Sequence, residues 1–149
     1  MYVAVHLLFS ANRWELAEEI KEKLSSGVTL VCDRYALSGV AFTASKPGMD
    51  AEWCKAPDAM LPAPDVVLFM DLTVEQAMQR GAFGDERYER KEFQETVRQN
   101  FLKLRDESSL KWEIIDAARS IEDVEADVQR IAIETIRQVE SGKPLGKLW

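Results

Sequence analysis

An aspartate and an arginine stand directly after an apolar run, and together they have the chemistry to hold a phosphorylated ligand. The run covers residues 28–32, and Asp33 and Arg34 follow it. If the run is a buried strand, both side chains lie at its carboxyl end, where open α/β sheets bind ligands. An aspartate there can hold Mg²⁺, and an arginine can fork onto a phosphate. In a plainer interpretation, Asp33 caps the next helix and Arg34 is a surface residue.

Three further segments carry residues that suit nucleotide binding. Phe9 and Arg13 are four apart and share a helix face, so a ring and a guanidinium could hold a base together; a core phenylalanine beside a solvated arginine is the alternative. Residues 80–89 read RGAFGDERYE. Their glycines predict a loop whose arginines could close over phosphates, or simply a connection between helices. Residues 38–42 contain Gly39, which permits close approach of a ligand or of a packed helix.

The elements that must position these residues follow from periodicity. Residues 28–32 and 66–70 are continuous apolar runs and predict parallel strands buried on both faces, with a weaker strand at 112–115. Helices are expected over 3–24, 73–80, around 93–104 and over 120–139. The first helix is marked by a stop at Gly27 and by an apolar stripe through Leu7, Leu8, Ala11, Trp14, Ala17, Ile20 and Leu24. The second begins with the capping-box pair Thr73 and Gln76, and the last with the N-cap Ser120. The third has the core positions Phe93, Val97, Phe101 and Leu104. Strands alternating with helices indicate an α/β fold with a parallel sheet.

Composition limits the class of protein. The chain has 149 residues, which fits a single domain over 1–149, and a net charge of -7. That charge argues against general binding to nucleic acid or to an anionic membrane. Cys32 and Cys54 are expected to be buried, reduced thiols. Reduced thiols indicate a cytoplasmic location, with nucleus or mitochondrion as alternatives. His6 is expected to be a surface or hydrogen-bonded residue. The proline-rich segment 44–64 is expected to be functional or partly helical.

The order of these segments resembles that of thymidylate kinases of the eukaryotic branch, from about residue 5 onward. The matching segments are 6–15 (HLLFSANRWE, the acceptor-site helix), 31–42 (VCDRYALSGVAF), 61–69 (LPAPDVVLF), the lid at 80–89, Phe93-Gln94, and 144–149 (PLGKLW). The resemblance implies a P-loop nucleoside-monophosphate-kinase fold and the transfer of phosphate from ATP to dTMP, giving dTDP for dTTP biosynthesis. It also implies Mg²⁺ as cofactor and a homodimer.

The resemblance assigns a role to each matching residue. Phe9 would stack on thymine, Arg13 would bond the base carbonyl edge, and Tyr88 would favour deoxyribose. The catalytic residues would be Arg34, which holds the acceptor phosphate, and Asp33, which positions Mg²⁺. The remaining nucleoside contacts would be Ser38, Gly39, Phe42 and Gln94, and the ATP side of the lid would carry Arg80, Glu86 and Arg87. Phe9, Arg13 and Tyr88 argue against UMP as the acceptor.

The sequence departs from the family's pattern in one respect. Thymidylate kinases begin with a strand, the phosphate loop GxxxxGK[ST], and a second strand, and the printed sequence contains no such loop. These parts are expected to precede residue 1. The segment would then lack the central strand beside 28–32, leaving two strand edges and apolar surface uncovered. By itself the chain is expected to be inactive, which leaves a catalytically silent dTMP-binding or dimerising form as the alternative function.

Overall fold

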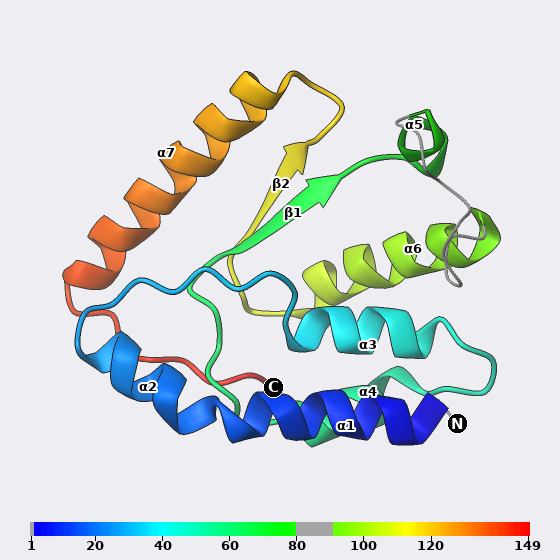
Figure 1. Ribbon diagram of the computed structural model, residues 1–149, viewed down its shortest axis with the longest axis horizontal. Helices are drawn as coiled ribbons and strands as arrows, with labels where there is room; N and C mark the ends of the chain where they lie inside the picture. Colours follow the sequence, from blue (N-terminus) through cyan, green and yellow to red (C-terminus); the bar gives the residue numbers. More distant parts are fainter. Residues whose placement is uncertain (1, 80–90) are drawn as a thin grey trace. The chain divides into compact units, whose positions relative to one another are not determined.

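The computed structural model describes residues 2–79 and 91–149 and divides into two compact parts (Figure 1). The first comprises Met1–Ala63, Val97–Ser108 and Leu145–Trp149, and the second comprises Pro64–Thr96 and Ser109–Pro144. Each part is described separately below. The single-domain organisation stays a prediction. The predicted lid falls outside the described residues, and with it Arg80, Glu86, Arg87 and Tyr88.

The second part contains a parallel pair of strands. β1 (Val67–Asp71) pairs with β2 (Trp112–Asp116), with Val67 opposite Trp112 at one end of the ladder and Asp71 opposite Asp116 at the other (Figure 1). The rings of Phe69 and Trp112 meet edge to face, with centroids 6.2 Å apart. Parallel neighbours require a helical crossover, and helical segments do lie between these strands in sequence. The predicted α/β class and two of the three predicted strands are confirmed.

The helices of the second part begin where the capping residues predict. At the start of α5 (Val74–Met78), the Thr73 hydroxyl accepts from the Gln76 amide and the Gln76 side chain accepts from the Thr73 amide. Ser120 accepts from the Asp123 amide at the start of α7 (Ile121–Glu140). α6 (Lys91–Glu107) begins in the second part and continues into the first, where it buries Val97 and Leu104, two of the predicted core positions.

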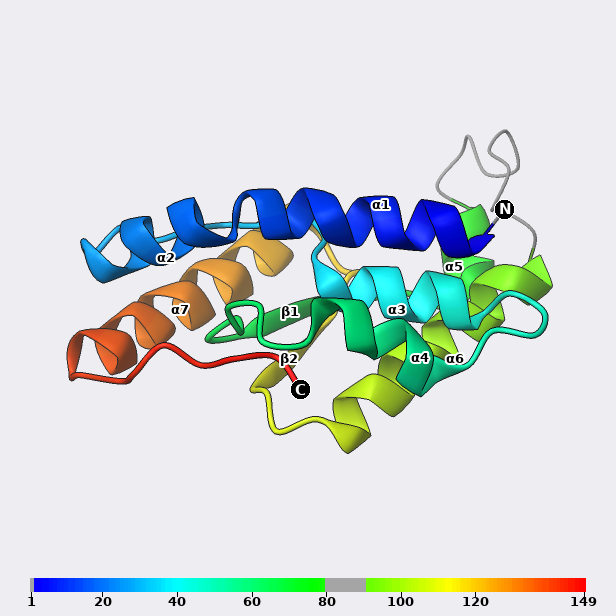
Figure 2. The same ribbon diagram turned by 90° about the horizontal axis from the view of Figure 1, so that it is seen from below.

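The first part is helical. Its helices are α1 (Tyr2–Glu15), α2 (Ala17–Ser25), α3 (Ala36–Ala44), α4 (Ala51–Lys55) and the 3₁₀ turn η1 (Ala56–Asp58). The single helix predicted over 3–24 is therefore divided at Leu16. Gly27 adopts a φ of 85° just after α2, as expected for a helix-terminating glycine. α1 and α3 run side by side (Figures 1 and 2), and α4 and η1 confirm that segment 44–64 is partly helical.

The C-terminal residues complete the core of the first part. Leu148 and Leu61 are fully buried and joined through the backbone, because the Leu148 amide donates to the Leu61 carbonyl at 2.9 Å. The Met60 amide donates to the Leu148 carbonyl at 3.0 Å, and the Trp149 indole donates to the Lys55 carbonyl at 2.6 Å. The residues on both sides of η1 are thus held to the same two C-terminal residues, Leu148 and Trp149.

The strand predicted at residues 28–32 is wrong in this structure. The segment is extended, but no described strand pairs with it, and Val31 is 97% exposed. An extended chain becomes a strand only when its amides and carbonyls meet those of a neighbour. Its exposure agrees with the expectation that apolar side chains here would be uncovered. The prediction of two buried thiols fails for the same reason: Cys54 is buried, but Cys32 belongs to this segment and is exposed.

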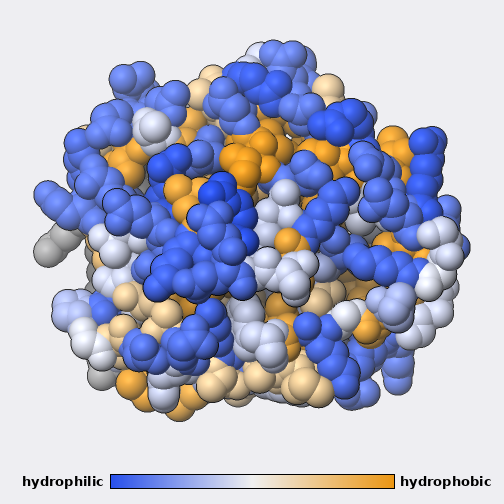
Figure 3. All heavy atoms as spheres, turned by 180° about the vertical axis from the view of Figure 1, so that it is seen from behind, coloured by the Kyte–Doolittle hydropathy of each residue, from blue (hydrophilic) through white to orange (hydrophobic). Residues whose placement is uncertain are grey.

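Other apolar side chains also reach the surface. Figure 3 shows hydrophobic side chains between hydrophilic ones on the face seen from behind. Many of the exposed ones belong to α1, among them Val3, Leu7, Leu8 and Trp14. Within the described residues, no helix is both long and apolar enough to cross a membrane.

Candidate functional site

The buried face of α1 is polar. His6 and Ser10 are its buried residues, and Arg13 is half-buried one turn further on, whereas Leu7, Leu8 and Trp14 of the predicted apolar stripe are exposed. The apolar side of this helix therefore faces the surface, and its buried face is the polar one. The physical reason is that the neighbouring segments offer hydrogen-bond partners, so a polar face is satisfied when it is buried.

His6 is a buried polar residue whose hydrogen-bonding groups all have partners. Its Nδ1 lies 3.0 Å from the Thr43 hydroxyl of α3, and its Nε2 lies 2.9 Å from the Cys54 carbonyl of α4. The ring also lies beside that of Trp53, with centroids 5.5 Å apart. Both ring nitrogens are occupied, so this histidine ties three helices together, as expected for a satisfied residue.

The centre of the site is a buried ion pair between α1 and η1. Arg13 donates from Nε to Oδ1 of Asp58 at 3.0 Å and from Nη2 to Oδ2 at 2.5 Å. The Ser10 hydroxyl lies 2.7 Å from the same Oδ1 and 3.0 Å from the Pro57 carbonyl. The Asp58 side chain is 0% exposed and that of Arg13 is 12% exposed. A forked, charge-assisted pair of this kind fixes both position and orientation of the guanidinium.

The guanidinium of Arg13 also lies close to Gly39 of α3. A Cβ added at Gly39 would lie 3.2 Å from Nη2 of Arg13 and 3.6 Å from Nη1. The guanidinium therefore rests against the backbone of α3, and the glycine leaves the room for it. The structure thus brings together Arg13 and Gly39, two residues that the resemblance assigned to the nucleoside pocket.

Phe9 lies one turn before Arg13 on α1, and its side chain is 62% exposed. The alternative of a core phenylalanine is therefore wrong. An exposed ring next to a fixed guanidinium has the composition of a site for a planar, polar heterocycle, because the ring offers a stacking face and the guanidinium offers hydrogen-bond donors.

Asp33 and Arg34 lie between the extended segment and α3. Arg34 has a φ of 65°, which is unusual for a residue with a side chain. Its guanidinium lies over the ring of Phe42, 5.3 Å from the centroid. The N-cap of α3 is Tyr35, without a side-chain cap, so the idea that Asp33 caps this helix is wrong. Strain of this kind persists where surrounding structure holds it, and it often marks a functional position.

The remaining predicted contacts lie on two helices. Ser38, Gly39 and Phe42 are half-buried on α3, and the Ser38 amide donates to the Tyr35 carbonyl at 3.1 Å. Gln94 lies on α6 within the second compact part. No group of three metal-binding side chains occurs among residues 2–79 and 91–149, and Asp33 is an exposed single carboxylate.

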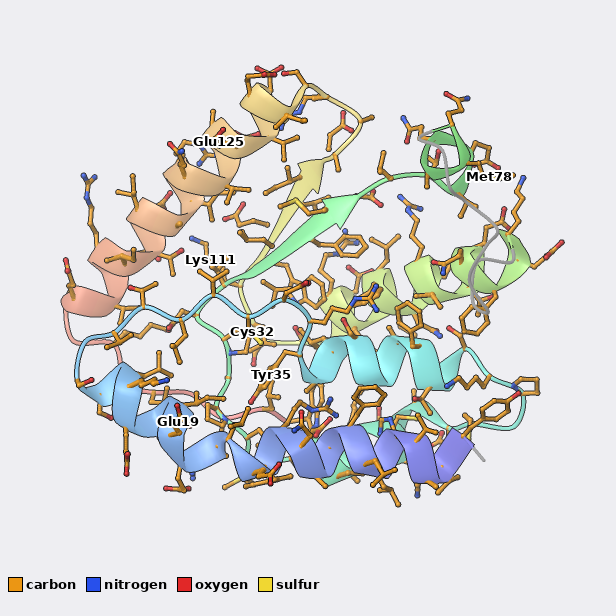
Figure 4. The ribbon with its side chains drawn as sticks, viewed as in Figure 1. Glu19, Cys32, Tyr35, Met78, Lys111 and Glu125 are labelled. Carbon is orange, nitrogen blue, oxygen red and sulfur yellow. The ribbon has the colours of Figure 1, made fainter. Side chains whose placement is uncertain are left out.

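Asp58 and Tyr35 are the residues that the sequence did not single out. The signal for Asp58 was weak, since an aspartate after a proline in a loop-like stretch is ordinary. Tyr35 stands near Cys32 at the start of α3 (Figure 4). Burial, followed by the charges of Asp58 and Cys32, raises the pKa of Tyr35 to about 12, against a smaller opposing effect of Arg13. Its hydroxyl is buried and has no hydrogen-bond partner among the described residues.

The raised pKa of Tyr35 predicts an alkaline loss of stability. An unfolded tyrosine ionises near pH ~10, whereas the folded chain keeps this proton to about 12. Between these values the unfolded state binds fewer protons, so the free energy of unfolding falls as pH rises. Full burial would make the effect ~2.7 kcal/mol, and partial exposure reduces our expectation to about 1 kcal/mol.

Tyr35→Phe removes the phenol whose ionisation causes this alkaline loss of stability. At pH 7 the variant should unfold within about 0.5 kcal/mol of the parent or be more stable, because an unpaired buried hydroxyl is lost. At pH 11, halfway through this window, urea unfolding should favour the variant by about 0.5 kcal/mol more than at pH 7. Tyr2→Phe, which removes an exposed phenol, is the matched control. If the difference in the free energy of unfolding between the variant and the parent were equal at pH 7 and pH 11, the raised pKa of Tyr35 would be contradicted.

Comparison with known proteins agrees with this geometry. The family model for thymidylate kinase matches residues 2–128. The thymidylate kinase of Homo sapiens is 53% identical over 146 residues, covering 98% of this chain and 68% of that protein. The thymidylate kinase of Danio rerio is 51% identical over 145 residues, with coverages of 97% and 68%.

A solved structure confirms the predicted fold. Thymidylate kinase from Candida albicans superposes with a TM-score of 0.81 at 30% identity and covers 100% of this chain and 74% of its own. The shared fold and the similarity to the human and zebrafish sequences cover nearly all of the 149 residues. The chain belongs to the thymidylate kinase family.

Proposed function

We propose that this chain carries the acceptor-nucleotide site of a thymidylate kinase, which transfers the γ-phosphoryl group of ATP to dTMP and forms dTDP. The observation that carries the proposal is the guanidinium of Arg13, fixed by Asp58 and Gly39 beside the exposed ring of Phe9. A stacking face and fixed donors suit a pyrimidine base. Arg34 then supplies the positive charge that an acceptor phosphate needs.

The roles of the site follow from the chemistry of each group. Phe9 stacks on the thymine ring, and the donors of Arg13 that Asp58 does not use bond a carbonyl of the base. Ser38, Gly39 and Phe42 line the nucleoside, and the role of Gln94 near the sugar stays a prediction from the resemblance. Arg34 binds the phosphate and offsets the charge that develops between donor and acceptor. Tyr88 against the sugar, and Arg80, Glu86 and Arg87 on the ATP side, stay predictions for residues outside the described part.

Asp33 fits the single-carboxylate contribution that Mg²⁺ commonly receives in kinases. Magnesium usually keeps several waters and binds one or two carboxylates plus substrate phosphates. Asp33 is exposed, as a carboxylate bound to a hydrated ion would be, and it adjoins Arg34. When bound with ATP, Mg²⁺ neutralises phosphate charge. Asp33 would then hold and orient the ion, and Arg34 would hold the acceptor phosphate.

The free thiol of Cys32 suits a reducing compartment, so a cytoplasmic location is part of the proposal.

Binding of dTMP is the first test of the proposed function. With dTMP at a hundred times its Kd, the free energy of unfolding should rise by about 2.7 kcal/mol. Thermal unfolding is measured with dTMP and with UMP as the control, and only dTMP should raise the midpoint. An equal shift with UMP would remove the thymidine assignment, and no shift with either would remove the binding site.

A coupled ADP-release assay on the same preparation tests catalysis. The printed sequence has no GxxxxGK[ST] loop to cradle the ATP phosphates, so we expect turnover by this chain alone to be lower by orders of magnitude than that of a thymidylate kinase with the loop. Turnover at the rate of such an enzyme would refute the catalytically silent form. Binding without turnover would support it.

Arg34 allows phosphate binding to be separated from backbone strain. Arg34→Ala and Arg34→Gly should both weaken dTMP binding by roughly 1.5–3 kcal/mol, because both remove the charged donor. Since Arg34 has a φ of 65°, the glycine variant should be the more stable by about 1 kcal/mol. Calorimetric titration and urea unfolding measure the two effects, with Arg130→Ala as control, because the Arg130 side chain is exposed. Unchanged dTMP affinity would refute the phosphate role.

The exposed apolar side of α1 supports a homodimer. Val3, Leu7, Leu8 and Trp14 are large, exposed and carried by one helix, and surfaces of this kind are commonly covered by a partner. We propose that a second copy of the chain covers them. In a twofold interface each residue acts twice, once from each subunit.

Sedimentation velocity over a concentration series tests the dimer. Leu8→Lys should weaken association at least about tenfold, because a charge replaces a buried leucine. Ile121→Lys alters an equally exposed apolar residue at the start of α7 and should leave association unchanged. Equal effects of the two substitutions, or a monomer at every concentration, would exclude this interface.

A further inference from the structure

Asp58 is the most deeply buried acidic residue of the described chain, with 0% of its side chain exposed. Its two oxygens receive hydrogen bonds from side chains of α1 alone: Arg13 at both oxygens and Ser10 at Oδ1. Removing a carboxylate from water is costly, and an apolar pair of similar volume often stabilises a protein equally well. Core packing alone therefore does not explain why a charged pair is found here.

Counting the donors of Arg13 shows what the ion pair does to it. A guanidinium has five N–H donors in a rigid fork. Nε and one hydrogen of Nη2 point at Asp58, which leaves three: both on Nη1 and one on Nη2. No residue of the described chain accepts a hydrogen bond from Nη1. The remaining donors therefore have a fixed direction, and the guanidinium that carries them rests against the backbone at Gly39.

Two features prevent the guanidinium from rotating or sliding. Asp58 holds it on two atoms, and the backbone at Gly39 would leave only 3.2 Å between Nη2 and an added Cβ. A free arginine carries about 2 kcal/mol of rotamer entropy, and this arrangement removes that freedom before any ligand binds. Pre-organised donors discriminate between ligands more sharply than mobile ones do, because a mobile side chain moves away from a mismatched group.

We propose that Asp58 is a positioning residue that sets the base specificity of the acceptor site, by fixing which donors of Arg13 face the base. This rests on the proposed function. Fixed N–H donors match a ring carbonyl and oppose an exocyclic amine, which presents N–H groups of its own. A site held in this way accepts 4-keto pyrimidines and rejects 4-amino pyrimidines. Without Asp58, the guanidinium turns away from an amine and the discrimination is lost.

The test uses dTMP and 5-methyl-dCMP, which share the sugar, the phosphate and the 5-methyl group. They differ in the 4-carbonyl with its N3–H against the 4-amine with its unprotonated N3. Calorimetric titration of the 149-residue chain gives the ratio of their Kd values. In Asp58→Asn this ratio should fall about tenfold or more, which is ~1.4 kcal/mol of discrimination. In the Arg13→Lys background the same substitution should leave the ratio unchanged, because Asp58 acts only through the fork of Arg13.

A matched control separates positioning from general destabilisation. Thr43→Val removes the buried contact between Thr43 and His6, also between α1 and α3, without touching the ion pair. It should lower stability and keep the ratio. Should Asp58→Asn not fold, Asp58→Glu keeps the charge but moves the carboxylate by one methylene, and the ratio should again fall.

The outcomes are distinguishable. A ratio that stays at the parental value in Asp58→Asn, or in Asp58→Glu where the asparagine variant does not fold, overturns the positioning role while the dTMP site stands. A ratio that falls equally in Thr43→Val also overturns it, because discrimination would then track stability. A parent chain that binds both ligands equally overturns the inference, because the site then does not distinguish a carbonyl from an amine. A parent chain that binds neither ligand would remove the proposed function itself.

Discussion

The buried ion pair between Arg13 and Asp58 organises the first compact part of the protein. Leaving either charge without its partner in such a place costs about 3–5 kcal/mol, so the pair forces α1 to present its polar face to η1. Ser10 and His6 lie on that same face, and Ser10 finds its partners in η1 whereas His6 finds its partners in α3 and α4. The apolar residues of α1 are turned to the surface as a consequence, which is where a partner subunit would meet them.

The ion pair between Arg13 and Asp58 also explains why a glycine stands at position 39 of α3. The guanidinium held by Asp58 needs space against α3, and Gly39 provides it. α3 in turn begins at Ala36, and its N-cap Tyr35 directly follows the strained backbone of Arg34. The residues proposed to bind the base and the phosphate are therefore connected through one short helix. Their positions depend on a few side chains rather than on a large core.

The sequence predicted the elements that local chemistry determines. The caps at Thr73 and Ser120 are hydrogen bonds between residues three apart, so they were readable without knowledge of the fold. The apolar runs that became β1 and β2 pair with each other within the described residues. The run at residues 28–32 looks the same in sequence but has no neighbour, and only the tertiary arrangement decides that.

The orientation of α1 was not predictable for a related reason. Hydrophobic periodicity identifies the face that water disfavours, but it does not identify a polar face whose partners lie more than forty residues away. Asp58 is 45 residues from Arg13, in a stretch that reads as an ordinary loop. The resemblance to thymidylate kinases located Phe9, Arg13 and Gly39, whereas the carboxylate that holds Arg13 became visible only in three dimensions.

The two ends of the proposed acceptor site are held by different forces. The base end lies within one compact part and rests on a buried, forked ion pair that does not involve a sheet. The phosphate end, Asp33 and Arg34, follows an extended segment without strand pairing and is held by a positive φ and by the contact of Arg34 with Phe42. Pairing of a strand with residues 28–32 would fix that segment through its backbone. The proposed recognition of the base therefore depends on side chains that are already in place, whereas the placement of the arginine proposed to bind the phosphate depends on the backbone that leads to it.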